Sequence, residues 1–191
     1  MQPVQRDEIL GIGEYEKIRP HFRARVIEEK KARRVALSNI MSAVFENHDT
    51  ALLQIQEMLR TERITKEESI LHEIETYNEL VPGPGQLKLT LFVEIADAEE
   101  REKMLRRLGG LEDHVALEVR GEKIPAKAKD RSVDGYERTT AVHYFTFDLP
   151  ESAVAALREG ATAALLVTHP EHDARAPLGP ETLRALREDL A

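Results

Sequence analysis

Three ionisable side chains stand at positions where the pattern of the sequence calls for apolar residues: Glu62, His143 and His169. Two imidazoles and one carboxylate form a ligand set that suits iron, manganese or zinc with an open coordination position. Without a metal, the same groups could act as general acid and base. The three residues come from distant parts of the chain, so their spacing alone indicates no site. The elements that carry them decide whether they meet.

Glu62 lies near the end of TALLQIQEMLRTER, residues 50–63, which has the apolar spacing of an amphipathic helix. At about 100° per residue, the apolar side chains fill an arc of roughly 120°, and Glu62 falls inside that arc, one turn beyond Met58. Either Glu62 lies past the edge of the core in water, or it points inward. An inward carboxylate would need a cation, a metal or a proton. Gln54 and Glu57 on the same helix are further candidates for lining a pocket.

His143 lies in a segment with the period of two that is typical of strands, whereas His169 ends a predicted strand that looks buried on both faces. In TTAVHYFTFDL, residues 139–149, His143 shares a face with the two phenylalanines. His169 is in phase with apolar residues at the end of a predicted strand over 163–169. We expect both rings to point inward, where each could also be an ordinary hydrogen-bonded core residue. His172, in HPEH, is an exposed fourth candidate.

The elements that would position these residues follow from periodicity and from turn residues. The sequence predicts helices near 20–33, 50–63, 66–77, 98–108 and 151–159 and a last helix after Gly179-Pro180, with strands near 35–45 (broken at Asn39), 87–95, 114–120, 140–148 and 163–169. Helix starts are indicated by Asp49 and by two capping boxes, Thr65 with Glu68 and Asp97 with Glu100.

The stretch VPGPG, residues 81–85, separates a mostly helical part, 1–80, from a strand-rich part, 86–191. Neither part has enough apolar residues of its own to suggest an independent fold. We therefore predict one α+β domain over residues 1–191, with a mainly antiparallel sheet of about five strands packed with helices.

The composition excludes several classes of function. The 191 residues include no cysteine, which excludes disulfides, cysteine-ligated metal or iron–sulfur centres and a cysteine nucleophile. The glycine-rich stretches lack the spacing of nucleotide-binding loops, and no hydrolase elbow occurs. No apolar run approaches the roughly 18 residues of a membrane span. The opening MQPVQRDEIL has no signal pattern, so we expect a cytoplasmic protein.

Charge is distributed unevenly along the chain. Residues 17–34 hold eight Lys or Arg against two Glu, a charge of +6, whereas the whole chain carries −8, so the remaining residues carry −14. This basic segment could fold onto its own acidic body or dock on an acidic protein. One aromatic residue, no recognised motif and an acidic remainder argue against nucleic acid. The expected docking anchors are Arg23, Arg25, Arg33 and Arg34.

Five motifs span nearly the whole chain: EYEKIRPHFRARVIEEKKARRVAL, QIQEMLRTERI, YNELVPG, AVHYF and a late HP after a strand. They resemble the uncharacterised bacterial family called domain of unknown function 3501. The resemblance implies no established activity. It does imply a supporting role in peroxide or electron-transfer metabolism, beside rubrerythrin-like proteins and iron–sulfur oxidoreductase subunits. The matching positions are Gln54, Gln56, Glu57, Arg60, Glu62, Tyr77, Asn78, His143 and His169.

Three functions are compatible with these residues. The favoured one is an accessory or binding protein of a redox or peroxide-stress system, in which the basic segment docks on an acidic partner. The second is a metal-dependent enzyme that uses His143, His169 and Glu62 to hold iron, manganese or zinc. The third is a small-ligand carrier with a pocket between sheet and helices, oriented by the same inward polar residues. All three functions are compatible with a homo-oligomer.

Overall fold

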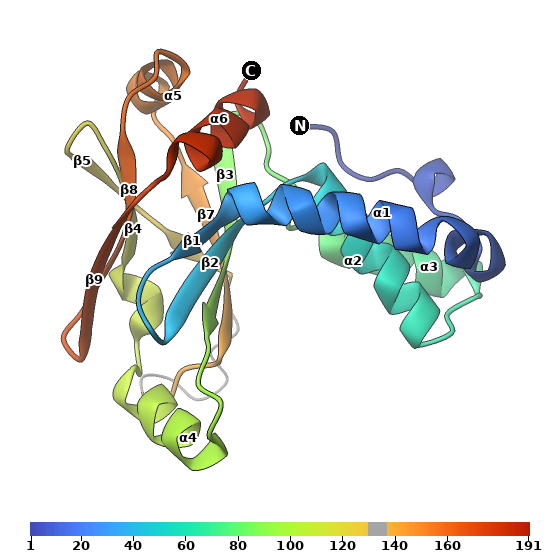
Figure 1. The fold of residues 1–191 in the computed structure, drawn as a ribbon, viewed down its shortest axis with the longest axis horizontal. Coiled ribbons are helices and arrows are strands. Elements are labelled where there is room, and N and C mark those ends of the chain that lie inside the picture. The colour runs from blue at the N-terminus through green and yellow to red at the C-terminus, as the bar shows by residue number, and fades with distance from the viewer. Residues whose placement is uncertain (130–136) are drawn as a thin grey trace.

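The computed structural model describes residues 1–129 and 137–191. Two antiparallel sheets pack together on one side of the molecule, and an arm of three helices extends from them (Figure 1). The predicted α+β class is therefore confirmed. The described residues build a second sheet in addition to the predicted one.

The first sheet contains, in spatial order, β1 (Arg34–Ala36), β2 (Met41–Glu46), β3 (Gln86–Val93), β7 (Val142–Asp148) and β6 (Lys127–Ala128). The second contains β5 (Glu122–Pro125), β4 (Val115–Val119), β8 (Ala163–His169) and β9 (His172–Pro177). Every pairing among the described strands is antiparallel. The segment predicted over 35–45 is the β1–β2 hairpin, which turns around Asn39.

Three strands were not predicted, namely β5, β6 and β9, and each lies at the edge of a sheet. Edge strands commonly carry polar and charged residues that discourage association with other chains. In β9 the burial alternates, but the inward side chains are a histidine and two alanines, so the strand carries little of the apolar signal on which the prediction relied.

The main hydrophobic core lies between the two sheets. Alternate residues of β3 and β7 point into it, as the period of two predicts. Side chains of the second sheet fill the opposite half, so both sheets share one core. Its members include Phe45, Leu87, Leu89, Leu91, Phe145, Phe147, Leu117, Leu165 and Val167.

Three helices border the sheets: α4 (Ala98–Arg107), α5 (Glu151–Arg158) and α6 (Pro180–Asp189). The predicted start of α4 is confirmed, since the Asp97 carboxylate accepts a hydrogen bond from the Glu100 amide at 2.8 Å. The end of α5 agrees with the helix predicted over 151–159: Glu159 is its C-cap residue, and Gly160 follows with a φ of +97°, a conformation that favours glycine. A short 3-10 helix, η2 (Leu111–His114), precedes β4.

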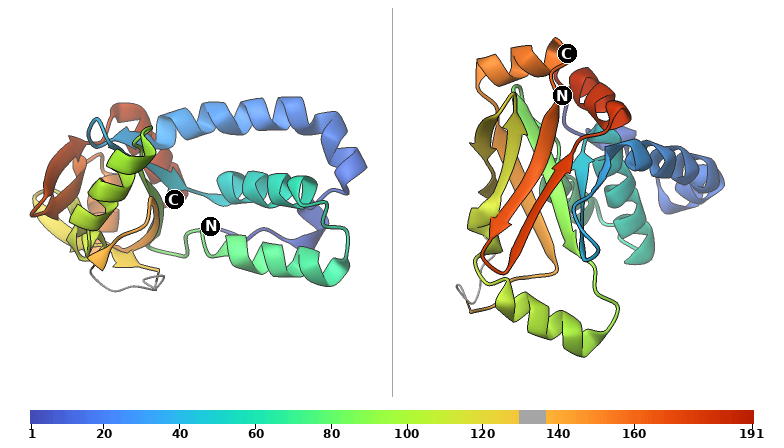
Figure 2. Two further views of the ribbon diagram at one scale, coloured as in Figure 1. Left: turned by 90° about the horizontal axis from the view of Figure 1, so that it is seen from below. Right: turned by 60° about the vertical axis from the view of Figure 1, so that its left-hand side comes forward.

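The helical arm consists of α1 (Ile12–Arg33), α2 (His48–Thr61) and α3 (Glu67–Asn78), with α2 lying between the other two (Figure 2). A second, smaller hydrophobic cluster holds α2 and α3 to the N-terminal segment, which includes the 3-10 helix η1 (Arg6–Glu8). This cluster contains Val4, Ile9, Ala51, Ile55, Leu59, Ile70, Ile74 and Val81.

The predicted starts of the arm helices need correction. α1 begins at Ile12, so Pro20 lies inside the helix instead of in its first turn. Asn47 caps α2, because its side chain accepts a hydrogen bond from the Thr50 amide, whereas Asp49 pairs with Arg25. At α3 the N-cap residue is Lys66, without a side-chain cap hydrogen bond, so the capping box predicted at Thr65 does not form.

Candidate functional site

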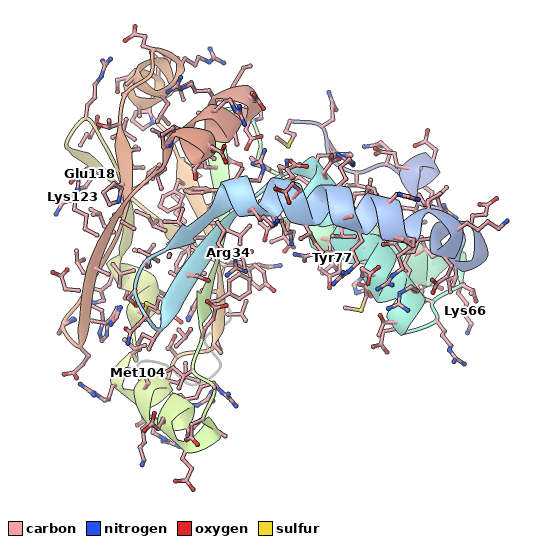
Figure 3. All side chains as sticks on the ribbon, viewed as in Figure 1. Arg34, Lys66, Tyr77, Met104, Glu118 and Lys123 are labelled. Atoms are coloured by element: carbon pink, nitrogen blue, oxygen red, sulfur yellow. The ribbon has the colours of Figure 1, made fainter. Side chains whose placement is uncertain are left out.

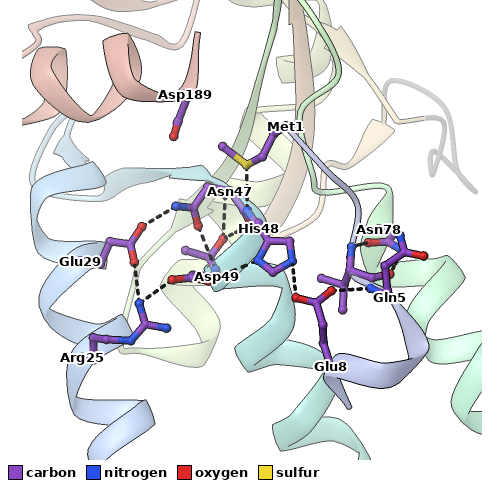
Figure 4. Close-up of polar contacts among 12 residues, drawn as sticks. Met1, Gln5, Glu8, Arg25, Glu29, Asn47, His48, Asp49, Asn78 and Asp189 are labelled. Carbon is purple, nitrogen blue, oxygen red and sulfur yellow. Dashed lines mark hydrogen bonds and ion pairs between the residues drawn. The ribbon is translucent and has the colours of Figure 1, made fainter. Parts of the chain in front are cut away.

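Two amides in the family-like motifs clamp the N-terminal segment to the arm. The Leu10 amide donates to Gln56 Oε1 at 2.8 Å, and Gln56 Nε2 donates to the Leu10 carbonyl at 3.3 Å. Asn78 does the same for Val4, at 2.7 and 2.9 Å (Figure 4). Gln56 is only 3% exposed, although on a helical wheel of α2 it lies outside the arc of apolar side chains. Both amides therefore stabilise the fold by replacing a missing backbone partner.

Glu57 joins α1 to α2. Its carboxylate accepts hydrogen bonds from Arg19 at 2.7 and 2.9 Å and from the Tyr15 hydroxyl at 2.7 Å. The Arg19 hydrogen bonds, with that of Tyr15, lower the pKa of Glu57 to about 2. Gln54 is partly buried on α2. Neither Gln54 nor Glu57 is among the residues that line the pocket described below.

Glu62 is the C-cap residue of α2 and is exposed to solvent. Its amide donates to the Met58 carbonyl at 2.9 Å, which completes the last turn of the helix. The structure therefore supports the first interpretation of Glu62, in which the side chain lies past the edge of the core in water. α2 ends at the part of the arm remote from the sheets (Figure 1).

His143 points inward, as its phase predicts, and is 5% exposed. Its Nε2 lies 2.7 Å from the Thr140 carbonyl oxygen and 3.1 Å from Thr139 Oγ1, and its Nδ1 lies 3.2 Å from Glu112 Oε1. Burial alone would raise the pKa of Glu112, but hydrogen bonds from His143, the backbone and Thr139 lower that pKa to about 2.

The order hydroxyl, imidazole, carboxylate in this cluster resembles a hydrolytic triad. A triad histidine must accept the hydroxyl proton at Nε2. Here the Nε2 proton of His143 is directed to the Thr140 carbonyl, and the Thr139 hydroxyl donates to Glu112 at 2.8 Å. The cluster thus fixes the start of β7 against η2 and does not prepare Thr139 as a nucleophile.

His169 also points inward and is 6% exposed. Its Nε2 lies 3.0 Å from the Gly109 carbonyl oxygen, and its Nδ1 accepts a hydrogen bond from the Glu171 amide at 3.1 Å. Both ring nitrogens are therefore used, as in a core histidine. His172 is its cross-strand partner and is partly buried, and burial, with a smaller effect from the neighbouring His169, lowers the pKa of His172.

The three residues of the predicted metal set do not come together. In residues 1–129 and 137–191, no group of three or more His, Asp or Glu side chains is arranged to hold a metal ion. The ring nitrogens of His143 and His169 are hydrogen-bonded to neighbouring groups of the protein, and Glu62 is exposed to solvent.

Three of the four arginines expected to anchor a partner are engaged within the chain. Arg33, 3% exposed, donates to both Asp189 oxygens at 2.6 and 2.8 Å and so ties α1 to α6. Arg34, labelled in Figure 3, donates to Ser42 Oγ at 2.6 Å, and its guanidinium lies over the Phe92 ring.

Arg25 belongs to a polar network at the base of the arm, where it pairs with Asp49 (Figure 4). Its guanidinium also lies over the Phe22 ring. His48 continues this network to Glu8, with 3.0 Å between Nε2 and the carboxylate. Arg23 is exposed on α1. Four of the eight basic side chains of residues 17–34 thus pair with carboxylates elsewhere in the same chain, namely Arg19, Arg25, Arg33 and Arg34.

A pocket of about 560 Å³ lies between the end of α3 and the outer face of the first sheet. Tyr77, on α3 (Figure 3), belongs to the YNELVPG motif and forms part of its wall. The arm side of the pocket consists of Thr76, Tyr77, Glu79 and Leu80, and the sheet side includes Gln86, Lys88, Lys127, Ala128, Lys129, Tyr144, Phe145, Thr146 and Asp148.

Lys88 is the distinctive group of this pocket. Its ammonium donates to Thr146 Oγ1 at 2.8 Å, and within the described ranges it forms no ion pair. Burial lowers the pKa of Lys88, and Asp148 only partly offsets this. The sequence placed Lys88 on the outward face of its strand. That placement is correct, but the arm covers this part of the face, which no pattern in the strand itself could indicate.

The fold and the pocket define an α+β protein with two packed antiparallel sheets, a helical arm and a cavity where arm and sheet meet. Residues 3–190 match the family described as "Protein of unknown function (DUF3501)", and the chain belongs to that family. It is similar to a protein from Burkholderia pseudomallei whose crystal structure is described as that of a novel protein of unknown function. The two are 36% identical, the match covers 100% of each chain, and the TM-score is 0.93. No curated protein matches the chain. Across the described ranges, no helix is long and apolar enough to cross a membrane.

Proposed function

We propose that this protein binds a small organic molecule in the pocket between α3 and the first sheet. The observation that carries the proposal is the pocket itself, whose volume of about 560 Å³ lies within the range of small-molecule sites. Its floor is built from β3 and β7, which are fixed in the middle of the sheet. Sites on such rigid elements hold a ligand with little loss of conformational entropy.

The lining has the mixed character that small-molecule sites require. Tyr77, Leu80 and Tyr144 offer aromatic and aliphatic surface, and Lys88 and Thr146 offer polar groups at the sheet. Apolar contacts supply affinity in such sites, and a few polar groups fix the orientation of the ligand. Small-ligand carriage, one of the three functions compatible with the sequence, is therefore the best supported. The polar residues involved differ from those that the sequence indicated.

The accessory role in a redox or peroxide-stress system is supported by the family resemblance only. The arginines expected to dock on an acidic partner pair mainly with the chain's own carboxylates. The metal-dependent enzyme would need His143 and His169 to give up their present hydrogen bonds. No structural feature supports the accessory role or the metal-dependent enzyme as directly as the pocket supports ligand binding.

A screen of small organic compounds by ligand-observed NMR tests the proposal, followed by a variant that fills the pocket. Ala128 lines the pocket on β6, so Ala128→Trp is expected to abolish binding of the compounds found. Ala36→Trp is the matched control, since Ala36 is an exposed alanine on β1, at the opposite edge of the same sheet. Hits that bind equally well to Ala128→Trp, or a screen without hits, would refute the proposal.

A further inference from the structure

The charged groups that line the pocket differ in whether they are paired. Lys127 pairs with Asp148 at 2.6 Å, and Lys129 pairs with Glu79 across the gap between sheet and arm. Asp148 also accepts a hydrogen bond from Gln86 at 2.7 Å. Both carboxylates of the lining are thus neutralised by lysines of the lining.

Lys88 is left over from this pairing. Within residues 1–129 and 137–191, its only hydrogen-bond partner is the Thr146 hydroxyl, which is uncharged. This partly buried ammonium loses solvation, and the nearby Asp148, already paired with Lys127, offsets only part of the loss. An anion placed beside it would restore the missing interaction through a charge-assisted hydrogen bond.

The carboxylate closest to Lys88 in strand register belongs to Glu46, directly opposite on β2. Glu46 is 1% exposed, and its Oε1 accepts a hydrogen bond from the Thr90 hydroxyl at 2.6 Å. Lys88 instead leans to the other neighbouring strand, β7, where Thr146 lies. The two side chains form no ion pair, so Glu46 does not take the place of an external anion.

We infer that the ligand of this pocket is a small organic monoanion, a carboxylate that binds the Lys88 ammonium and extends an apolar body along the tyrosines. This inference rests on the proposed function. One unpaired lysine matches one negative charge. The other two lysines of the lining already pair with Asp148 and Glu79, so no unpaired cation remains for a second acidic group. Tyr77, Leu80 and Tyr144 supply the surface for the apolar body.

Matched pairs of acid and amide test this inference, because the two members share shape and differ in charge. The probes are hexanoate with hexanamide and phenylacetate with phenylacetamide, titrated into the full chain by NMR at neutral pH. The wild-type chain is expected to bind each acid about tenfold or more tightly than its amide, the usual gain from a hydrogen bond to a charged group. In Lys88→Gln the preference is expected to fall to about twofold or less.

Two further variants keep the test decisive. Lys88→Arg retains the charge and is expected to retain the preference for the acid. Lys123→Gln removes an exposed lysine of β5 in the second sheet and is expected to change nothing (Figure 3). A thermal melt of each variant establishes that it is folded before titration. If Lys88→Gln does not fold, loss of the preference for the acid at higher pH, as Lys88 loses its proton, provides the same test.

The outcomes separate the inference from the proposed function. If the amides bind as tightly as the acids, or if Lys88→Gln keeps its preference for the acids, the inference is wrong while small-molecule binding stands. If none of the probes and no compound of the wider screen binds, both are wrong. A preference for the acids that depends on the charge of residue 88 confirms the inference.

Discussion

Lys88 and Thr146 face each other on β3 and β7, and the lysine ammonium donates to the threonine hydroxyl at 2.8 Å. The pair lies on the outer face of the first sheet, where α3 and the turn after it cover the strands. The hydroxyl gives the ammonium a hydrogen bond but no charge compensation. A ligand that enters between arm and sheet would reach this lysine directly.

The clamp formed by Gln56 should contribute measurably to stability. Gln56→Ala leaves the Leu10 amide without its partner, and we expect the free energy of unfolding to fall by about 1–3 kcal/mol. Urea denaturation measures this loss. Hydrogen exchange at the Leu10 amide should accelerate as well. Gln54→Ala, on the same helix, is the control and should change the free energy by less than about 0.5 kcal/mol. Equal losses in both variants would contradict the clamp.

The buried pair of Arg33 and Asp189 should be the strongest single link between α1 and α6. Arg33→Met leaves the Asp189 carboxylate buried without a partner, which typically costs about 3–5 kcal/mol. Chemical denaturation gives the value. Arg23→Met, at an exposed site on α1, should stay within about 0.5 kcal/mol of the wild type.

A double variant distinguishes the pair from simple loss of packing at Arg33. Asp189→Leu added to Arg33→Met should recover part of the lost stability, because no buried charge then remains unpaired. A double variant less stable than Arg33→Met would argue against this explanation.

The free energy of unfolding should fall as the pH falls, and part of this decline should depend on Glu57. In the folded chain its pKa is about 2, below the ordinary value of 4.5. The unfolded chain therefore takes up the proton first, and the stabilisation is complete above about pH 4.5 and is lost as the pH falls toward about 2. Glu57→Gln should show a shallower decline in the free energy of unfolding over this interval than the wild type.

Denaturation midpoints measured at several pH values give this comparison. The variant should keep some pH dependence, because Glu112 also takes up its proton at lower pH in the folded chain than in the unfolded one. Burial would raise the pKa of Glu112, but its hydrogen bonds lower that pKa to about 2. Identical slopes in variant and wild type would show that Glu57 is not linked to folding in this way.

The two inward histidines should act in stability and not in metal retention. His143→Asn and His169→Asn each remove hydrogen bonds of a buried ring, and each should lower the free energy of unfolding by about 1–3 kcal/mol. Elemental analysis of the untagged protein should give the same iron, manganese and zinc content in the wild type and both variants. One metal ion per chain that disappears in His143→Asn would restore the metal-dependent enzyme as the leading hypothesis.

Local patterns in the sequence were enough for much of the fold. Alternation identified β3 and β7, and a continuous apolar run identified β8. The phase of His143 and His169 in these strands gave their inward direction, and the Asp97 cap identified the start of α4. These features depend on neighbours a few residues away. The edge strands were missed because their side chains are mostly polar and exposed.

The pocket and the clamps depend on contacts between distant segments. The helical wheel of α2 assumes one buried face, yet the N-terminal segment covers a second one and buries Gln56 there. In the same way, a strand read alone gives Lys88 an exposed face, and only the position of α3 encloses it. A glutamine or lysine carries no sign in its own sequence context that another segment will cover it.

Chemical-shift mapping of the isotope-labelled chain with phenylacetate tests the central claim most directly. The account predicts that the largest shifts fall on Lys88, Thr146 and Ala128 and saturate with one site per chain, whereas phenylacetamide produces much smaller shifts at equal concentration. Shifts scattered over the surface, shifts centred outside the cavity between α3 and the first sheet, or no shifts with either compound would contradict it.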